Sequence, residues 1–332
     1  MMKYFWAGVG VFGALFIHGC SNKELYKPEN IKGEWRSAGH LSAPLHQVSE
    51  SGALLANGNV LGKQGEKKVK IPTEFRLLNI SDGWIITQNS DNNLELIPED
   101  GVSPHVVLEL KRTIAAASVE GDVLAILFGN NEMALYSLET KMMTFKESSN
   151  APIAVDSRIS NPKFLKDLVL FLTLDGKIVI VNVSEKKLLR SIIVGSEEYF
   201  NNVTYLNMIE NNMIASTGDS VLALSQKESR EKYEVRDIAY TEDGVWLTTK
   251  QGEVIALTPT LQLKAKKKFP FAHFVGISVQ KDYVYVLEQG GYMIALSKDL
   301  LTYDVYDVDM KHDTVFVGED KIYFNDRYIQ IK

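Results

Sequence analysis

A two-strand pattern returns along this sequence about every forty residues. Each copy opens on Asp or Asn, runs through alternating apolar residues, passes a turn that often contains Gly, and enters a second apolar run. The spacings between openings are 40, 45, 45, 31, 39 and 38 residues, and the openings are Asp82, Asp122, Asp167, Asn212, Asp243, Asp282 and Asp320. A fixed period in this range is typical of repeat architectures, and a four-stranded propeller blade needs about 40 to 45 residues. The repeat therefore predicts a β-propeller of four-stranded antiparallel blades.

Residues 241–258 show why each copy reads as a β-hairpin. Val245 and Leu247 alternate with Trp246 and Thr248, and a turn containing Gly252 precedes a second alternating run. Alternate side chains of a strand point to opposite faces. Because both faces are apolar, the pattern indicates a blade packed between two neighbours. Small residues recur in the second runs, and their size suggests a crowded place near the propeller axis: Ala134, Ala223, Ala256 and Ala295.

The number of blades and the closure of the ring rest on the two ends of the chain. A weaker hairpin at 50–72 would add an eighth unit to the seven anchored ones, so eight blades are favoured and seven stay open. Residues 328–332 resemble the third strand of a blade, and a strand from the region of Trp35 would complete that blade. A β-sandwich also has many short strands, but the long regular period argues against it. The propeller domain is expected over residues 49–332.

The first twenty residues resemble a bacterial lipoprotein signal. Lys3 precedes an apolar stretch of 14 residues, which is short for a membrane span and typical of a signal peptide. The stretch ends in Ile17-His18-Gly19-Cys20, similar to a lipobox, although His18 departs from the usual small residue. This resemblance implies a signal peptide at 1–19 and lipidation of Cys20. Residues 21–48 are polar and irregular, so 20–48 is interpreted as a tether that could also supply the closing strand. A transmembrane anchor or an incidental cysteine is the alternative.

Charge and motif content exclude several classes of function. The net charge is −6 and the pI is about 5.6, which argues against nucleic-acid binding. The basic run 264–268 is expected to be a solvated outer strand, with an anionic lipid or partner contact as the alternative. The six histidines lack zinc-ligand spacing, and the acidic run 304–309 lacks the pattern of a calcium loop. The sequence therefore predicts no catalytic residue, no cofactor and no metal.

The second runs of two copies carry a family resemblance. Gly252-Glu253-Val254-Ile255-Ala256-Leu257 and Gly291-Tyr292-Met293-Ile294-Ala295-Leu296 resemble the PQQ-like propeller repeat. Together with the lipobox, the chain resembles the BamB lipoproteins of the β-barrel assembly machinery. The quinoprotein enzymes share this repeat, and many of them carry two adjacent cysteines beside the cofactor. Such a pair cannot exist in a chain whose single cysteine is Cys20.

The BamB resemblance implies a non-enzymatic scaffold on the periplasmic side of the outer membrane. Its expected partners are the POTRA domains of the barrel-inserting subunit, with a role in outer-membrane protein insertion. Ser21, rather than Asp, follows the cysteine and favours outer-membrane sorting. Two alternatives stay open: an envelope lipoprotein with another partner, and a ligand-binding propeller with polar groups converging on its central channel.

Overall fold

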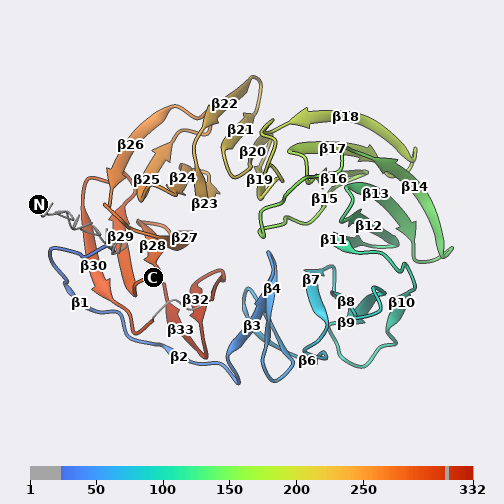
Figure 1. Ribbon diagram of the computed structural model, residues 1–332, viewed down its shortest axis with the longest axis horizontal. Helices are drawn as coiled ribbons and strands as arrows, with labels where there is room; N and C mark the ends of the chain where they lie inside the picture. Colours follow the sequence, from blue (N-terminus) through green and yellow to red (C-terminus); the bar gives the residue numbers. More distant parts are fainter. Residues whose placement is uncertain (1–23, 311–313, 332) are drawn as a thin grey trace, which may run out of the picture.

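The computed structural model describes residues 24–310 and 314–331, which form a ring of eight β-sheets (Figure 1). The predicted signal peptide and Cys20 lie outside these residues. Every sheet contains four antiparallel strands of a blade, and one carries an additional parallel strand at its edge. The predicted all-β propeller is confirmed, and the number of blades is the favoured eight rather than seven.

The first four blades follow one another along the chain, and each begins with its innermost strand. Blade 1 contains β3 (Leu45–Val48), β4 (Gly52–Leu55), β5 (Asn59–Gly62) and β6 (Gly65–Lys70). Blade 2 contains β7 (Arg76–Ser81), β8 (Trp84–Gln88), β9 (Leu94–Pro98) and β10 (Val106–Leu108). Blade 3 contains β11 (Ile114–Glu120), β12 (Val123–Phe128), β13 (Glu132–Ser137) and β14 (Met142–Ser148). Blade 4 contains β15 (Lys163–Leu165), β16 (Leu168–Leu172), β17 (Lys177–Asn182) and β18 (Lys187–Ile193).

The remaining blades repeat this order, except that the last one takes its outer strand from the N-terminal region. Blade 5 contains β19 (Tyr205–Ile209), β20 (Asn212–Ser216), β21 (Ser220–Leu224) and β22 (Glu228–Lys232). Blade 6 contains β23 (Val235–Thr241), β24 (Gly244–Thr249), β25 (Glu253–Leu257) and β26 (Leu263–Lys268). Blade 7 contains β27 (Phe274–Val279), β28 (Tyr283–Glu288), β29 (Tyr292–Ser297) and β30 (Tyr303–Asp307). Blade 8 contains β31 (Val315–Val317), β32 (Lys321–Phe324), β33 (Arg327–Gln330) and β2 (Gly39–His40).

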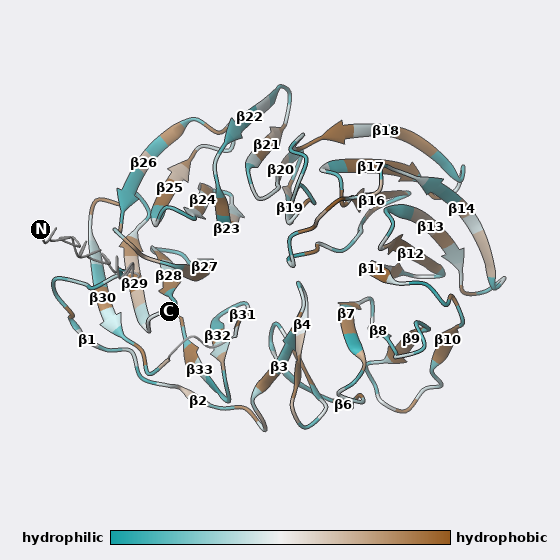
Figure 2. Ribbon diagram, in the orientation of Figure 1, coloured by the Kyte–Doolittle hydropathy of each residue, from teal (hydrophilic) through white to brown (hydrophobic). Residues whose placement is uncertain are grey.

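Hydrophobic packing between neighbouring blades holds the ring together. The buried apolar residues form eight clusters, one at each contact between adjacent blades. On β24, Val245 and Leu247 belong to the cluster shared with blade 5, whereas Trp246 belongs to the cluster shared with blade 7. Figure 2 shows the same division, with hydrophobic middle strands such as β12 and β28 and a largely hydrophilic outer strand β26. The expectation that both faces of a blade are buried is confirmed.

The recurring alanines lie in a different place from the one their size suggested. Ala134, Ala223, Ala256 and Ala295 occupy the third strands β13, β21, β25 and β29, not the strands nearest the axis. Each contributes to an apolar cluster between two blades. The prediction of an axial position was wrong because sheet-to-sheet contact within the ring also requires small side chains.

The N-terminal region closes the ring and continues along its outer rim. Within the predicted tether 20–48, the described residues 24–48 lie against the propeller and contribute strands to it. β2 pairs antiparallel with β33 through Gly39 and Tyr328, which completes blade 8 a few residues beyond Trp35. β1 (Gly33–Glu34) adds a parallel strand to β30, and β3 is the inner strand of blade 1. Two chain-distant strands therefore pair in the last blade, which joins the first and last parts of the ring.

Gly252 offers a test of the turn geometry that the repeat imposes. Its φ is +74°, and an added Cβ would lie 2.5 Å from the carbonyl oxygen of Phe269. We expect Gly252→Ala to lower the free energy of unfolding by about 3 kcal/mol, because left-handed strain and steric overlap add. Gly83 also has a positive φ, +77°, but no atom lies within 4 Å of an added Cβ. Gly83→Ala should therefore cost only about 1 kcal/mol in chemical denaturation, and equal losses would contradict the role of the overlap.

Candidate functional site: a charged pocket on the propeller axis

The segment that connects blades 3 and 4 leaves the rim and enters the centre of the ring (Figure 1). We name residues 149–162 the axial segment. It has no strand of its own and is held by polar contacts. The amide of Phe200 donates to the carbonyl of Ala154 at 3.0 Å, and the amide of Asp156 donates to the side chain of Asn202 at 2.6 Å. These bonds fix the segment to the connection that precedes blade 5.

The far end of the axial segment crosses the ring to blade 1. The amide of Asn161 donates to the carboxylate of Glu50 at 2.7 Å, and Lys163 forms an ion pair with the same carboxylate at 2.5 Å. Glu50 lies in the turn between β3 and β4, which is not adjacent to blade 4 in the ring. Ser118 on β11 donates to the carbonyl of Pro162 at 2.7 Å. The segment thus connects blades that make no direct contact as neighbours.

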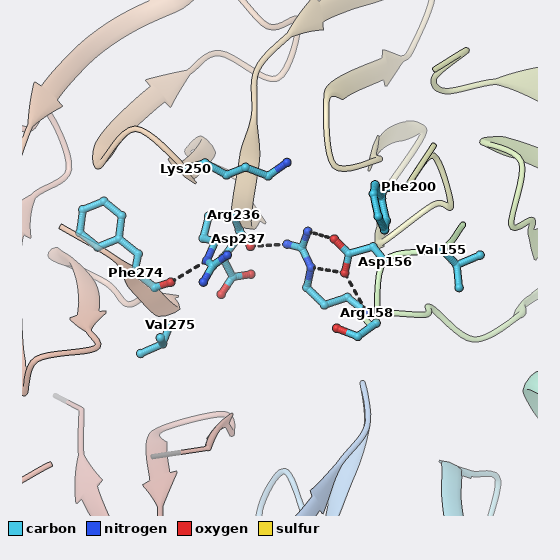
Figure 3. A pocket seen from close by; sticks show the side chains of 10 residues that line it. Val155, Asp156, Arg158, Phe200, Arg236, Asp237, Lys250, Phe274 and Val275 are labelled. Atoms are coloured by element: carbon cyan, nitrogen blue, oxygen red, sulfur yellow. Dashed lines mark hydrogen bonds and ion pairs between the residues drawn. The ribbon is translucent and has the colours of Figure 1, made fainter. Parts of the chain in front are cut away.

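A pocket of about 510 Å³ opens beside the axial segment, and we name it the axial pocket (Figure 3). It is bounded by the axial segment on one side and by the beginnings of β23 and β27 on the other. Charged and apolar side chains share its wall. The lining residues are Val155, Asp156, Ser157, Arg158, Phe200, Arg236, Asp237, Lys250, Phe274 and Val275.

Asp156 and Arg158 form a two-bond ion pair within the axial segment. Nε of Arg158 donates to Oδ1 of Asp156 at 2.9 Å, and Nη2 donates to Oδ2 at 2.5 Å. Nη1 of Arg158 donates to the carbonyl oxygen of Arg236, which ties the segment to blade 6. Burial opposes the charge of Asp156, but the hydrogen bonds and charge of Arg158 outweigh burial and hold the pKa of Asp156 below its ordinary value. Both side chains are therefore charged and satisfied by each other.

The positive charges of Arg236 and Lys250 are less fully balanced by nearby hydrogen-bond acceptors and carboxylates. Nε of Arg236 donates to the carbonyl of Phe274 at 3.1 Å, which leaves the two terminal nitrogens toward the pocket. Burial, followed by the positive charge of Arg158, lowers the pKa of Arg236. The ammonium of Lys250 is 3.8 Å from the carboxylate of Asp219, a loose pair at a side chain that is 42% exposed. The pocket therefore contains positive charge that an incoming anion would stabilise.

The negative charge of the Asp237 carboxylate is partly stabilised by backbone amides. Its carboxylate accepts hydrogen bonds from the amides of Ile238 at 2.9 Å and Ile277 at 3.1 Å, joining β23 to β27. Burial nevertheless raises the pKa of Asp237 above its ordinary value. Asn79 and Asn207 occupy similar places on β7 and β19, and each binds the backbone of the next blade. The side chain at this position therefore connects one blade to the next. Of these three residues, Asp237 of blade 6 is the acid, and it lines the axial pocket.

The arrangement of these side chains is suited to binding a ligand that carries both charge and apolar surface. Three cations, two carboxylates and apolar side chains share one concave surface. Among the residues that the structure describes, no group of three His, Cys, Asp or Glu side chains is placed to hold a metal ion. Over the same residues, no helix is long and apolar enough to cross a membrane.

The sequence named few of these residues. Cys20 lies outside the described residues, and the basic run 264–268 is the outer strand β26, where Lys266 pairs with Glu253 at 2.8 Å. The acidic run 304–309 lies largely on the outer strand β30. The axial pocket was missed, although one signal was present: the spacings from Asp122 to Asp167 and from Asp167 to Asn212 are each 45 residues, longer than the other spacings. The first of these two intervals contains the axial segment, and the second contains Phe200 and Asn202, to which the segment binds.

The Asp156–Arg158 pair predicts a pH-dependent contribution to stability. We expect Asp156→Asn to lower the free energy of unfolding by about 2 kcal/mol at neutral pH, a value discounted because the Arg158 side chain is 37% exposed. The native pKa of Asp156 is depressed, so its contribution is present above the unfolded carboxyl pKa and is lost as pH falls through the native pKa. Urea denaturation between neutral and acidic pH measures this. Arg36→Ala, which removes an exposed pair with Glu34, is the control and should change little; a pH-independent Asp156→Asn effect would contradict the ion pair.

Comparison with known proteins places this geometry among propellers. No protein-family model matches the chain. Over 93% of its own length, this chain is 27% identical to the plasminogen-binding protein PgbB of Helicobacter pylori strain J99. It is 26% identical over 94% of its length to the protein of the same name from strain 26695. The chain spans 65% of the length of each of these curated relatives.

Solved structures with the same fold have little sequence in common with this chain. BamB from Moraxella catarrhalis superposes with a TM-score of 0.70 at 13% identity, covering 89% of this chain and 99% of that one. The C-terminal WD40 domain of Sif2 gives a TM-score of 0.65 at 12% identity, covering 91% of this chain and 100% of that domain. At such identities the likeness concerns the fold alone. The chain is therefore a propeller whose fold resembles that of BamB and whose sequence is similar to that of PgbB.

Proposed function

We propose that this chain is a protein-binding scaffold of the bacterial cell envelope. The observation that carries the proposal is the sequence similarity over 93% of the chain to proteins named for binding another protein. The closed ring of eight blades is consistent with this role. Affinity purification from crosslinked membranes, followed by mass spectrometry, tests it. Enrichment of one protein partner at a constant ratio supports a scaffold, and recovery of the chain alone contradicts it.

The axial pocket is the surface through which we propose that the partner binds. Arg236 and Lys250 present positive charge that the pocket itself does not fully compensate. Phe200, which is 53% exposed, and Val275 add apolar surface beside that charge. Interfaces commonly combine an aromatic or Arg anchor with a polar surrounding. The partner element should therefore carry a carboxylate next to an apolar side chain.

Two partners are proposed at finer detail, and each has its own support. The lipobox-like sequence and the BamB-like repeat support the POTRA domains of the barrel-inserting subunit, with a role in outer-membrane protein insertion. The name of the Helicobacter pylori relatives supports plasminogen as a ligand. Surface-immobilised full-length protein can be exposed to purified POTRA domains and to plasminogen in parallel. Saturable binding of one of them identifies the partner, and no binding of either would contradict both finer proposals.

Lys250 provides a test of the binding surface. It lies in the turn between β24 and β25, at the end of the ring that contains the axial pocket. We expect Lys250→Glu to weaken partner binding about tenfold or more, because it places a negative charge opposite the partner's carboxylate. Lys227→Glu makes the same change in the exposed turn between β21 and β22, at the opposite end of the blades, and should leave binding unchanged. Equal effects of the two substitutions in surface plasmon resonance would exclude the axial pocket as the contact.

Cys20 provides the test of localisation, which we propose to be the outer membrane with the propeller facing the periplasm. Labelled palmitate should enter the protein in growing cells, and Cys20→Ser should abolish the label. Because two or more acyl chains are enough for stable anchoring, the parent protein should stay with the membrane pellet after a high-salt wash. Separation of inner and outer membranes on a density gradient then gives the sorting. An unlabelled parent protein, or label retained in Cys20→Ser, would contradict lipidation at this position.

A further inference from the structure

An exposed groove lies on the outer rim of the propeller, next to the beginning of the described chain. We name it the rim groove. It has a volume of about 680 Å³ and lies between the end of β26, the beginning of β30 and residues 24–29. Its exposed apolar side chains include Leu25, Phe271 and Tyr303, which are 63%, 59% and 42% exposed. The groove shares no lining residue with the axial pocket and has no place in the partner-binding surface proposed above.

Phe271 is displayed in a backbone conformation that disfavours it. The amide of Ala272 donates to the carbonyl of Phe269 at 3.1 Å, which closes a four-residue turn with Pro270 at its second position. Phe271 is at the third position with a φ of +64°, where Gly or Asn is usual. A bulky residue with positive φ is strained. Phe271 thus combines a strained backbone with an exposed phenyl group, and this combination would suit a contact outside the propeller.

Tyr26 fixes the chain to the rim beside this turn. Its ring is buried and packs edge-on against Phe269 at 6.0 Å and Tyr292 at 5.8 Å between centroids. Tyr26 follows Cys20 by six residues, which span at most about 20 Å when fully extended. A lipid on Cys20 would therefore hold the rim groove close to the bilayer surface.

The charges around the groove agree with a lipid interface. Lys27, Lys267 and Lys268 line it, against two acids, Glu24 and Glu29. The ammonium of Lys267 lies over the ring of Tyr303 at 4.7 Å from its centroid. Aromatic rings and lysines beside exposed apolar side chains are typical of surfaces that enter the headgroup region.

We propose that the rim groove is a membrane-contact surface, in which Phe271 and Leu25 enter the interface of an anionic bilayer and the lysines contact lipid phosphates. This inference rests on the proposed lipidation of Cys20. It fixes the orientation of the scaffold: blades 6 and 7 face the membrane, and the opposite rim, with blades 2 and 3, faces away from it.

The experiment uses the full lipidated protein in vesicles of phosphatidylethanolamine and anionic phosphatidylglycerol. Acylation of Cys20, the single cysteine, leaves one added thiol for an environment-sensitive fluorophore. Phe271→Cys places the probe in the rim groove, and Met142→Cys, 64% exposed on β14, places it on another rim. Lipids that carry a nitroxide should quench the Phe271→Cys probe several-fold more than the Met142→Cys probe. Equal, weak quenching of both would overturn the proposal.

Two further measurements separate this proposal from the proposals on which it rests. Thiol titration of the parent protein detects failure of lipidation, because a free Cys20 then takes up the fluorophore. Phe271→Gly should raise the melting temperature by relieving the positive φ, yet reduce quenching of a probe at Tyr303→Cys several-fold. A purely structural role for Phe271 predicts no such loss of quenching, so unchanged quenching in this variant would also overturn the proposal.

Discussion

Burial of both faces of every blade is the constraint on which the rest of this structure depends. Because alternate residues of one strand, such as Trp246 and Leu247, enter different inter-blade clusters, no blade completes its core alone. Each must be covered on both sides, and the condition is met for all of them when the ring closes. Closure requires pairing between strands far apart in the chain, which β2 and β33 provide. The ring then holds the axial segment and the rim groove in fixed places.

The axial segment forms part of the surface that we propose for partner binding. Its contacts with Glu50, Asn202 and Arg236 reach blades 1, 5 and 6, so its position depends on the intact ring rather than on one blade. The Asp156–Arg158 pair is satisfied within the segment, whereas Arg236 and Lys250 keep charge for a ligand. One wall of the pocket therefore has its charges paired within the segment, and the other wall, with Arg236 and Lys250, has positive charge that is not fully paired.

The N-terminal region also links fold to function. A tether that begins at Cys20 and ends at residue 48 would let the propeller turn freely. The docking of Tyr26 and the pairing of β1 and β2 leave only a few residues between the proposed lipid and the rim. The same residues that close the ring would therefore orient it, with the axial pocket at one end of the ring and the rim groove on its side.

The sequence by itself determined the repeat, the hairpin of each unit and the two-sided burial of the blades, because period-two alternation and turn glycines are local properties. It also indicated eight units and closure by the N-terminal region. The tertiary structure decided the positions of Ala256 and its counterparts, and it selected Gly39 and His40 as the closing pair. It alone brought Arg158 of the axial segment next to Arg236 and Lys250 of blade 6, since these residues are far apart in the chain and no local pattern marks them. Charges that meet across a ring are set by its closure, which is a property of the whole chain.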